Sequence, residues 1–258
     1  MKILCALSHR NSKKMFLPNS LIKSLKHQEN HLEKEFSLLC WNVAKLTLKS
    51  HYKEFLNTLV EGYKLDILLL QEVKKSLSHE LELHDYSYIL SPNIETKNHI
   101  FGVLSAFKSS CHGELSLLTK KRELRCATHK TTLLTHHKIS EHTTLLIVNL
   151  HAINFVHNSD FKNELREIYE AIKMHNGAMI VAGDFNTWNL KRVHYLEEFS
   201  NDLELKKVAF ESEKDIKKVF SNSLDYIFYR GLEVTFATVV DSKKISDHNP
   251  IIAKFCTV

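Results

Sequence analysis

The sequence contains few of the residues that interrupt or divide a chain. Its 258 residues include 6 Gly and 3 Pro, and no Pro-, Gly- or Ser-rich linker separates one part from another. Internal repeats and low-complexity tracts are also absent. A chain of this length without a linker favours one large domain with a substantial hydrophobic core.

The sequence also lacks the patterns of a zinc-binding, redox or membrane-spanning protein. Its five Cys are far apart and form no CxxC pair, which argues against a zinc ribbon or a thioredoxin-like motif and favours reduced thiols. No apolar run is long enough to span a membrane, and charges directly follow the short apolar run at the N-terminus. We therefore expect a soluble, cytoplasmic monomer, and no protein partner is evident.

The charge balance is mildly basic. Lys and Arg number 35 against 30 Asp and Glu, and the resulting net charge of +5 is compatible with a polyanionic partner without requiring one. The 17 His would add positive charge at mildly acid pH, but outside the motifs no pair has a convincing metal-ligand spacing. The adjacent His136 and His137 point to opposite faces if they lie on a strand.

From residue 36 onward, short apolar runs dominate and strands outnumber helices. We expect strands at 36–43, 65–73, 102–108, 130–139, 143–153, 178–185, 223–232, 234–240 and 249–257, and helices at 52–64, 161–175 and about 193–203. Asp160 is the expected N-cap of the second helix. Residues 1–35 are expected to form an N-terminal extension, packed or partly mobile, with a short helix within 21–36, before a domain at 36–258. Together, these strands and helices indicate a layered α/β domain.

Polar side chains collect where the predicted strands begin or end. These residues are Asn42, Glu72, His151, Asn154, Asp184, Asn186, Asp225, Asp247 and His248. Each alone fits a turn or a cap, but strand ends in layered α/β folds converge on one edge, where ligands bind. Carboxylate and amide oxygens suit Mg²⁺ or Mn²⁺. Water activated near such an ion, with His and Asn donors facing the developing charge, suits hydrolysis of a phosphate ester.

Six blocks of the sequence resemble, in the same order, the signature of the endonuclease/exonuclease/phosphatase superfamily. The blocks are LLCWNV, LLLQEV, VNLHAINF, IVAGDFNTW, SLDYIFYRG and SDHNPIIAKF. They span about residues 36–258, and GDFN together with a terminal SDHxP is a specific combination. The strings HAxNF, GDFNxW and LDxxFYRGL are similar to an uncharacterised bacterial subgroup of this superfamily.

The resemblance implies a DNase I-like fold, an α/β four-layer α-β-β-α sandwich. It also implies a divalent-metal-dependent phosphodiesterase, in the first place a nuclease that hydrolyses DNA or RNA through an activated water. The alternative is a phosphomonoesterase or a sphingomyelinase-type phospholipase that acts on lipid or small-molecule phosphates, because one fold carries several activities.

By similarity, Glu72 is the main direct ligand of Mg²⁺, with Mn²⁺ as a substitute, and Asn42 and Asp247 complete or orient the hydrated ion. Asp184 orients or deprotonates the attacking water. Asn186 donates a hydrogen bond to the phosphate as charge develops.

The resemblance also implies that Asp225 pairs with a ring nitrogen of His248, which stabilises a phosphate oxygen or acts as an acid. His151 and Asn154 match a catalytic and a phosphate-contacting position of the superfamily. The Glu that pairs with the corresponding His in DNase I has no match around residues 96–103, so the partner of His151 stays open.

A few further residues are candidates for substrate contact. Trp188 follows GDFN and either packs in the core or stacks on a base or sugar. Lys191 and Arg192 either contact phosphates or are solvated after a turn. Lys130 and Arg125, on a predicted hairpin, are weaker candidates.

Overall fold

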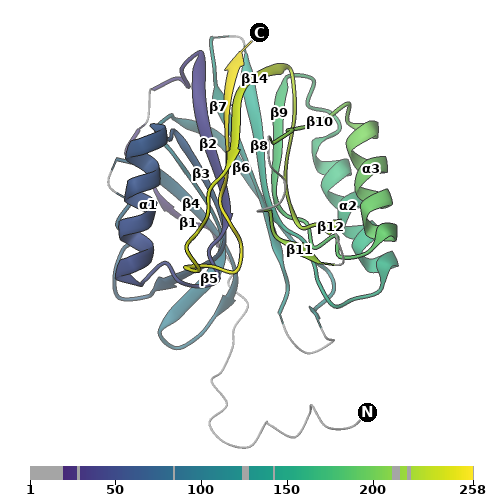
Figure 1. Cartoon of the computed structure of the whole chain (residues 1–258), viewed down its shortest axis with the longest axis horizontal. Coiled ribbons are helices and arrows are strands. Elements are labelled where there is room, and N and C mark those ends of the chain that lie inside the picture. The colour runs from purple at the N-terminus through teal and green to yellow at the C-terminus, as the bar shows by residue number, and fades with distance from the viewer. Residues whose placement is uncertain are drawn as a thin grey trace, which may run out of the picture.

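The computed structural model describes residues 20–27, 30–83, 85–123, 128–141, 143–210, 216–219 and 222–257. Within these residues, two mixed sheets pack face to face, and helices cover both outer faces (Figure 1). This arrangement is the predicted four-layer α-β-β-α sandwich. The fold class expected from the resemblance is therefore confirmed.

The first sheet has the strand order β1-β4-β5-β3-β2-β15-β14. Its strands are β1 (Ile22–Ser24), β2 (Glu35–Asn42), β3 (Ile67–Ser76), β4 (Ser87–Glu95), β5 (His99–Phe107), β14 (Leu232–Val239) and β15 (Ile251–Thr257). Helix α1 (Ser50–Tyr63) covers its outer face (Figure 1). It connects β2 to β3, which pair in parallel, as a helical crossover does.

The second sheet has the strand order β10-β13-β9-β8-β7-β6. Its strands are β6 (Cys111–Leu118), β7 (Thr131–Lys138), β8 (Thr144–His151), β9 (Ala178–Asp184), β10 (Lys206–Lys207) and β13 (Asp225–Arg230). Helices α2 (Asn158–Ile172) and α3 (Leu190–Asp202) lie on its outer face (Figure 1). Strands β11 (Lys218–Val219) and β12 (Asn222–Ser223) form a separate ribbon.

Alternate residues of the central strands supply different layers of the core. In β2, Leu38 and Cys40 face the second sheet, whereas Leu39 and Trp41 pack toward α1. All four side chains are almost fully buried. Because both faces of these strands are covered, their sequences are continuous apolar runs instead of alternating ones. Polar residues therefore mark the points where the strands leave the core.

Some elements differ from the sequence-based expectation. The predicted short helix within 21–36 is wrong, because Ile22–Ser24 instead form an edge strand that pairs with β4. Strands β4 and β6 were not predicted. Helix α2 begins three residues before the predicted start, with His157 as N-cap, so Asp160 lies in the first turn, where its carboxylate faces the positive end of the helix dipole.

The predicted N-terminal extension is described only from residue 20 onward, and Arg125 lies outside the described residues. Leu32 from this segment is buried in the core between the sheets, and its N–H donates to the carbonyl of Lys138. No helix in the described ranges has both the length and the apolar composition needed to cross a bilayer.

Candidate active site

The predicted site residues meet where the ends of both sheets come together. Strand register places His151 opposite Asp184, and Asp184 opposite Asp225, in one row across the second sheet. Asn42 reaches this row from the first sheet, and its Nδ2 donates to Oδ2 of Asp184 at 3.0 Å. Residues from four strands in two sheets thereby form one buried polar cluster.

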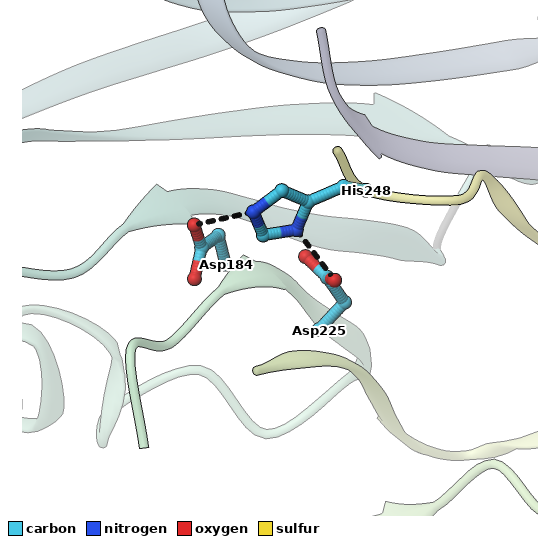
Figure 2. Close-up of side chains that lie close together, drawn as sticks. All are labelled: Asp184, Asp225 and His248. Atoms are coloured by element: carbon cyan, nitrogen blue, oxygen red, sulfur yellow. Dashed lines mark hydrogen bonds and ion pairs between the residues drawn. The ribbon is translucent and has the colours of Figure 1, made fainter. Parts of the chain in front are cut away.

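A histidine lies between two carboxylates at the centre of the cluster (Figure 2). Nδ1 of His248 is 2.7 Å from Oδ2 of Asp225, and Nε2 is 3.8 Å from Oδ2 of Asp184. Burial alone lowers the pKa of His248, but the carboxylates of Asp225, Asp184 and Asp247 outweigh that effect and raise it to about 9. The imidazole is therefore cationic at neutral pH, and the expected pairing with Asp225 is present.

Both oxygens of Asp184 accept hydrogen bonds. Oδ2 accepts from Asn42, and Oδ1 accepts from the backbone N–H of Asn186 at 3.0 Å. Burial raises the pKa of Asp184, and the positive charge of His248 partly offsets the effect of burial. A carboxylate with a raised pKa is a better proton acceptor than an exposed one, which suits a general base.

The glycine of the GDFN motif allows strands β8 and β9 to lie close together at the site. Gly183 has φ = 150°, and a Cβ atom there would lie 1.9 Å from the carbonyl oxygen of Leu150. A larger residue would therefore separate the strand ends. The glycine therefore permits the parallel pairing of β8 with β9 that places His151 beside Asp184.

Two asparagines connect the loops that follow these strands. Nδ2 of Asn154 donates to Oδ1 of Asn186 at 2.8 Å, and Nδ2 of Asn186 donates to the carbonyl of Ala152, also at 2.8 Å. Asn186 has φ = 50°, a left-handed conformation that Asn tolerates better than most residues. The second polar residue of GDFN thus has both a conformational and a positioning role.

Glu72 lies at an irregularity in β3. The pairing register with β5 shifts between Leu70 and Val73, and Glu72 between them has φ = 54°. Bulges of this kind redirect a side chain beside an active site. Here Oε1 of Glu72 lies 3.9 Å from Nε2 of His151.

Two lysines approach the carboxylate of Glu72. Nζ of Lys45 is 3.3 Å from Oε2, and Nζ of Lys130 is 3.9 Å from Oε1. Both lysines lie at strand ends, Lys45 just after β2 and Lys130 just before β7. Lys130 was predicted only as a weaker candidate for substrate contact, and Lys45 was not predicted. In the sequence, the only feature that pointed to either lysine was a positive charge next to a predicted strand end.

Lys130 is also the closest contact of His151. Its Nζ lies 3.0 Å from Nε2 of His151 and 3.6 Å from Oε2 of Glu123. Burial lowers the pKa of His151 well below its usual value, and the charge of Lys130 lowers it further. The open question about the partner of His151 is thus answered by a lysine, which keeps the ring neutral.

Arg192 holds the two site loops together from behind. It is fully buried, and its Nη1 donates to the carbonyls of Ile153 at 2.9 Å and Asn186 at 3.0 Å. Both roles considered for it, a phosphate contact and a solvated charge, are therefore wrong. Its guanidinium lies 5.1 Å from the ring centre of Trp188, which is half-buried. Trp188 belongs neither to the deep core nor to the open surface, and Lys191 is exposed.

The remaining predicted metal ligands differ in their surroundings. Oδ1 of Asn42 accepts from the N–H of Ala44 at 3.1 Å. The side chain of Asp247 is 66% exposed and forms an ion pair of 3.1 Å with Lys217. Asp247 therefore lies at the rim of the site, whereas Glu72 and Asn42 lie further inside.

The donor chemistry of the cluster fits a divalent cation. Glu72 and Asp247 supply carboxylate oxygens and Asn42 supplies an amide oxygen, the donor type that hard cations prefer. Asp184, Asp225 and His248 also offer ligand atoms that all lie within 4.8 Å of one another. The hydrogen bond between Asp225 and His248 favours proton handling as the role of that pair.

The sequence profile of the Endonuclease/Exonuclease/phosphatase family matches residues 39–248. The chain belongs to this family. A UPF0294 protein of Yersinia enterocolitica is 32% identical to it over 222 residues, which cover 84% of this chain and 82% of that relative. The members of the endonuclease/exonuclease/phosphatase family are phosphoric-ester hydrolases.

Solved structures share the family fold. A family protein from Leptotrichia buccalis matches with a TM-score of 0.66 at 19% identity, covering 85% of this chain and 99% of that chain. The human Nocturnin catalytic domain with bound sulfate anion matches with a TM-score of 0.65 at 18% identity, covering 93% and 97%. A humanized Danio rerio TDP2 matches with a TM-score of 0.67 at 15% identity, covering 87% and 100%. At these identities the likeness concerns the fold.

Proposed function

We propose that this family member is a Mg²⁺-dependent phosphodiesterase that cleaves nucleic acid. The observation that carries the proposal is that His248 lies between Asp225 and Asp184, and that His151 lies between Asp184 and the carboxylate of Glu72. This arrangement combines a cationic donor, a buried carboxylate base and a ligand for a hard cation, which are the parts needed for water to attack a phosphate ester.

The proposed reaction assigns one task to each group. Asp184 takes a proton from the attacking water as its oxygen bonds to phosphorus and the bond to the leaving oxygen breaks. His248, held by Asp225, donates through Nε2 to a phosphate oxygen as negative charge develops. A divalent cation held by Glu72, with Asn42 and Asp247, supplies further positive charge to the phosphate when it is bound.

The asparagines and Lys130 complete the proposed phosphate site. Asn154 and Asn186 are hydrogen-bonded to each other, so they act as one preorganised unit beside the base. The ammonium of Lys130 adds a buried positive charge near His151. Preorganised donors in a buried site stabilise developing charge without reorganisation in the transition state.

Charge supports nucleic acid as the substrate. The chain is basic overall, and Lys45 and Lys130 both face the cluster at Glu72. The related fold of Nocturnin binds a sulfate anion, which has the tetrahedral shape of a phosphate. A phosphomonoester or lipid phosphate is the competing substrate class, because fold and catalytic groups alone do not determine the substrate.

A substrate panel tests the proposal. The purified protein is incubated with Mg²⁺ or Mn²⁺ and single-stranded DNA, duplex DNA, RNA, sphingomyelin vesicles or sugar phosphates. We expect cleavage of nucleic acid that EDTA abolishes and that D184N and H248A each reduce by about 10²–10⁴-fold. Release of choline or free phosphate without nucleic-acid cleavage would instead establish the competing class, and activity that survives both substitutions would reject the assigned site.

A further inference from the structure

A groove of about 1040 Å³ lies beside the catalytic cluster. Phe155 and Trp188 supply aromatic surface to it, Lys120, Lys121 and Arg122 supply positive charge, and His129 also lines it. The volume is at the upper end of small-ligand pockets, and the groove is open to solvent. An open groove of this volume has room for a ligand larger than a single small molecule.

The walls of the groove continue directly from residues of the site. Phe155 follows Asn154, and Trp188 is two residues beyond Asn186. His129 precedes Lys130. Arg122 precedes Glu123, whose Oε1 accepts from the N–H of Asn154 at 2.7 Å. The groove residues are thus sequence neighbours of the residues assigned to the phosphate site, and a ligand in the groove lies next to that site.

Phe155 is held out of the core by its backbone. It has φ = 51°, a conformation that is costly for a large side chain, and 64% of the residue is exposed. Phe161, at the start of the following helix α2, is buried instead, so the two phenylalanines of this segment differ in exposure. An exposed ring at a strained position beside a catalytic loop is typical of a functional contact.

Trp188 presents a second aromatic surface. Arg192 packs against its ring, which keeps the indole in place at the groove. Its Nε1 is buried and has no hydrogen-bond partner among the residues that the structure describes. The indole is therefore fixed by packing, and the groove contains two aromatic side chains of different exposure.

Positive charge dominates the same groove. Lys120, Lys121 and Arg122 are consecutive and exposed, whereas Asp160 is the acidic residue of the lining. Lys120 is paired with Glu167 at 2.7 Å, and Nε of Arg122 donates to Nε2 of His129 at 3.1 Å. Lys121 and Arg122 keep a net positive charge toward the groove, as a phosphate backbone requires.

We propose that this groove binds single-stranded nucleic acid that runs into the active site, with an unpaired base stacked on Phe155 and phosphates at Lys121 and Arg122. Aromatic rings interleaved with basic residues are the means by which proteins hold single strands. A duplex is less suited, because its bases already stack on one another and do not present a free face. This inference rests on the proposed function for the identity of the ligand.

Binding of a fluorescent oligonucleotide tests the groove separately from catalysis. Fluorescence anisotropy is measured in EDTA, so that no cleavage occurs, with a single strand of about 12 nucleotides. Phe155→Ala is expected to weaken binding roughly 5- to 100-fold, and Phe155→Trp is expected to restore it. K121A/R122A is expected to reduce the dependence of log affinity on log salt by about 1.4, or about 0.7 for each lost phosphate contact.

A matched control removes two charges elsewhere. Lys34 precedes β2 at the end opposite Asn42, and Lys206 pairs with Tyr229 near the end of β13 opposite Asp225. K34A/K206A therefore changes the net charge by the same amount but leaves the groove intact. It is expected to retain the wild-type salt dependence to within experimental error.

The outcomes separate this inference from the proposed function. Wild-type affinity in Phe155→Ala and K121A/R122A would overturn the groove assignment, even if the protein cleaves nucleic acid. Equal loss of duplex and single-strand binding in Phe155→Ala would overturn the single-strand assignment. Binding that depends on Phe155 in a protein that cleaves no nucleic acid would support the groove and reject the nuclease. Thermal unfolding of each variant confirms that it is folded.

Discussion

The ammonium nitrogen of Lys130 lies 3.0 Å from Nε2 of His151, and both residues are more than nine-tenths buried. The positive charge and the burial keep His151 neutral, whereas Asp225 and its neighbours keep His248 cationic. Two histidines of one site thus differ in charge at neutral pH, one neutral and one cationic. Such a division marks His248 as the cationic donor and His151 as a neutral hydrogen-bonding group.

Replacing Lys130 tests its contribution to the phosphate site. Lys130→Met is expected to reduce turnover by about 10²-fold, because the site loses a preorganised positive charge. Lys130→Arg retains the charge and is expected to recover part of the activity. The measurement is steady-state cleavage with a melting curve for each variant, because Oε2 of Glu123 loses its ion pair with Lys130. Equal turnover in Lys130→Met and the wild type would exclude this role.

Replacing Asp225 tests the support of His248. Asp225→Asn removes the charge that lies 2.7 Å from Nδ1, so the pKa of His248 is expected to fall from about 9. Turnover is expected to fall by about 10²–10⁴-fold. NMR titration of the His248 ring together with kinetics checks both effects. An unchanged pKa would contradict the electrostatic account, because a purely structural role would not hold the ring protonated.

Two substitutions at Glu72 and Lys45 are expected to change metal affinity in opposite directions. Glu72→Gln removes the main ligand charge and should weaken binding of Mg²⁺ or Mn²⁺ by at least about tenfold, as measured by titration calorimetry. Lys45→Ala removes an exposed ammonium 3.3 Å from the same carboxylate and should strengthen binding by roughly two- to fivefold. Weaker binding in Lys45→Ala would show that Lys45 supports the metal site instead of competing with the ion.

Glu164 is expected to make stability depend on pH. Burial raises its pKa to about 8, and the hydrogen bond from Ile153 and the charge of Arg192 only partly offset this effect. The unfolded chain releases this proton near pH 4.5, so the free energy of unfolding should fall as pH rises from about 4.5 to 8. The loss is on the order of a few kcal/mol.

Glu164→Gln isolates this effect because the amide stays neutral and still accepts from the N–H of Ile153. Urea unfolding across the pH range should show similar stability of the two proteins near pH 4 and greater stability of the variant near pH 9. Parallel stability curves would mean that Glu164 ionises in the folded protein as it does in the unfolded chain.

Arg192 is expected to stabilise both the fold and the site loops. Arg192→Met removes its hydrogen bonds to buried carbonyls and should lower the free energy of unfolding by about 2–5 kcal/mol. Activity should also decrease, because the backbone of Asn186 loses its support. Lys191→Met, at the exposed neighbouring position, should change stability by less than about 0.5 kcal/mol. Denaturant unfolding of both variants gives the comparison, and a wild-type value for Arg192→Met would be inconsistent with the buried network.

Much of the cluster was predictable from local patterns. Strands buried on both faces are continuous apolar runs, so the polar residues that end them, such as Asn42, Asp184 and His151, stand out in the sequence. Gly183 before Asp184 is explained by the close approach of Leu150. The ordered blocks around these residues were sufficient for the fold and the family.

The apolar runs, the polar residues that end them and the ordered blocks thus predict the layers of the fold and the residue types at its edge. Which charges meet depends on the tertiary structure. The left-handed backbone of Glu72 lies where the pairing of β3 with β5 shifts register, and the contact of Lys130 with His151 joins positions 21 residues apart. The sequence indicated a phosphate contact or a solvated charge for Arg192, because its carbonyl partner Ile153 lies 39 residues away in another loop. These relationships arise from long-range register and burial, which no local pattern of residues contains.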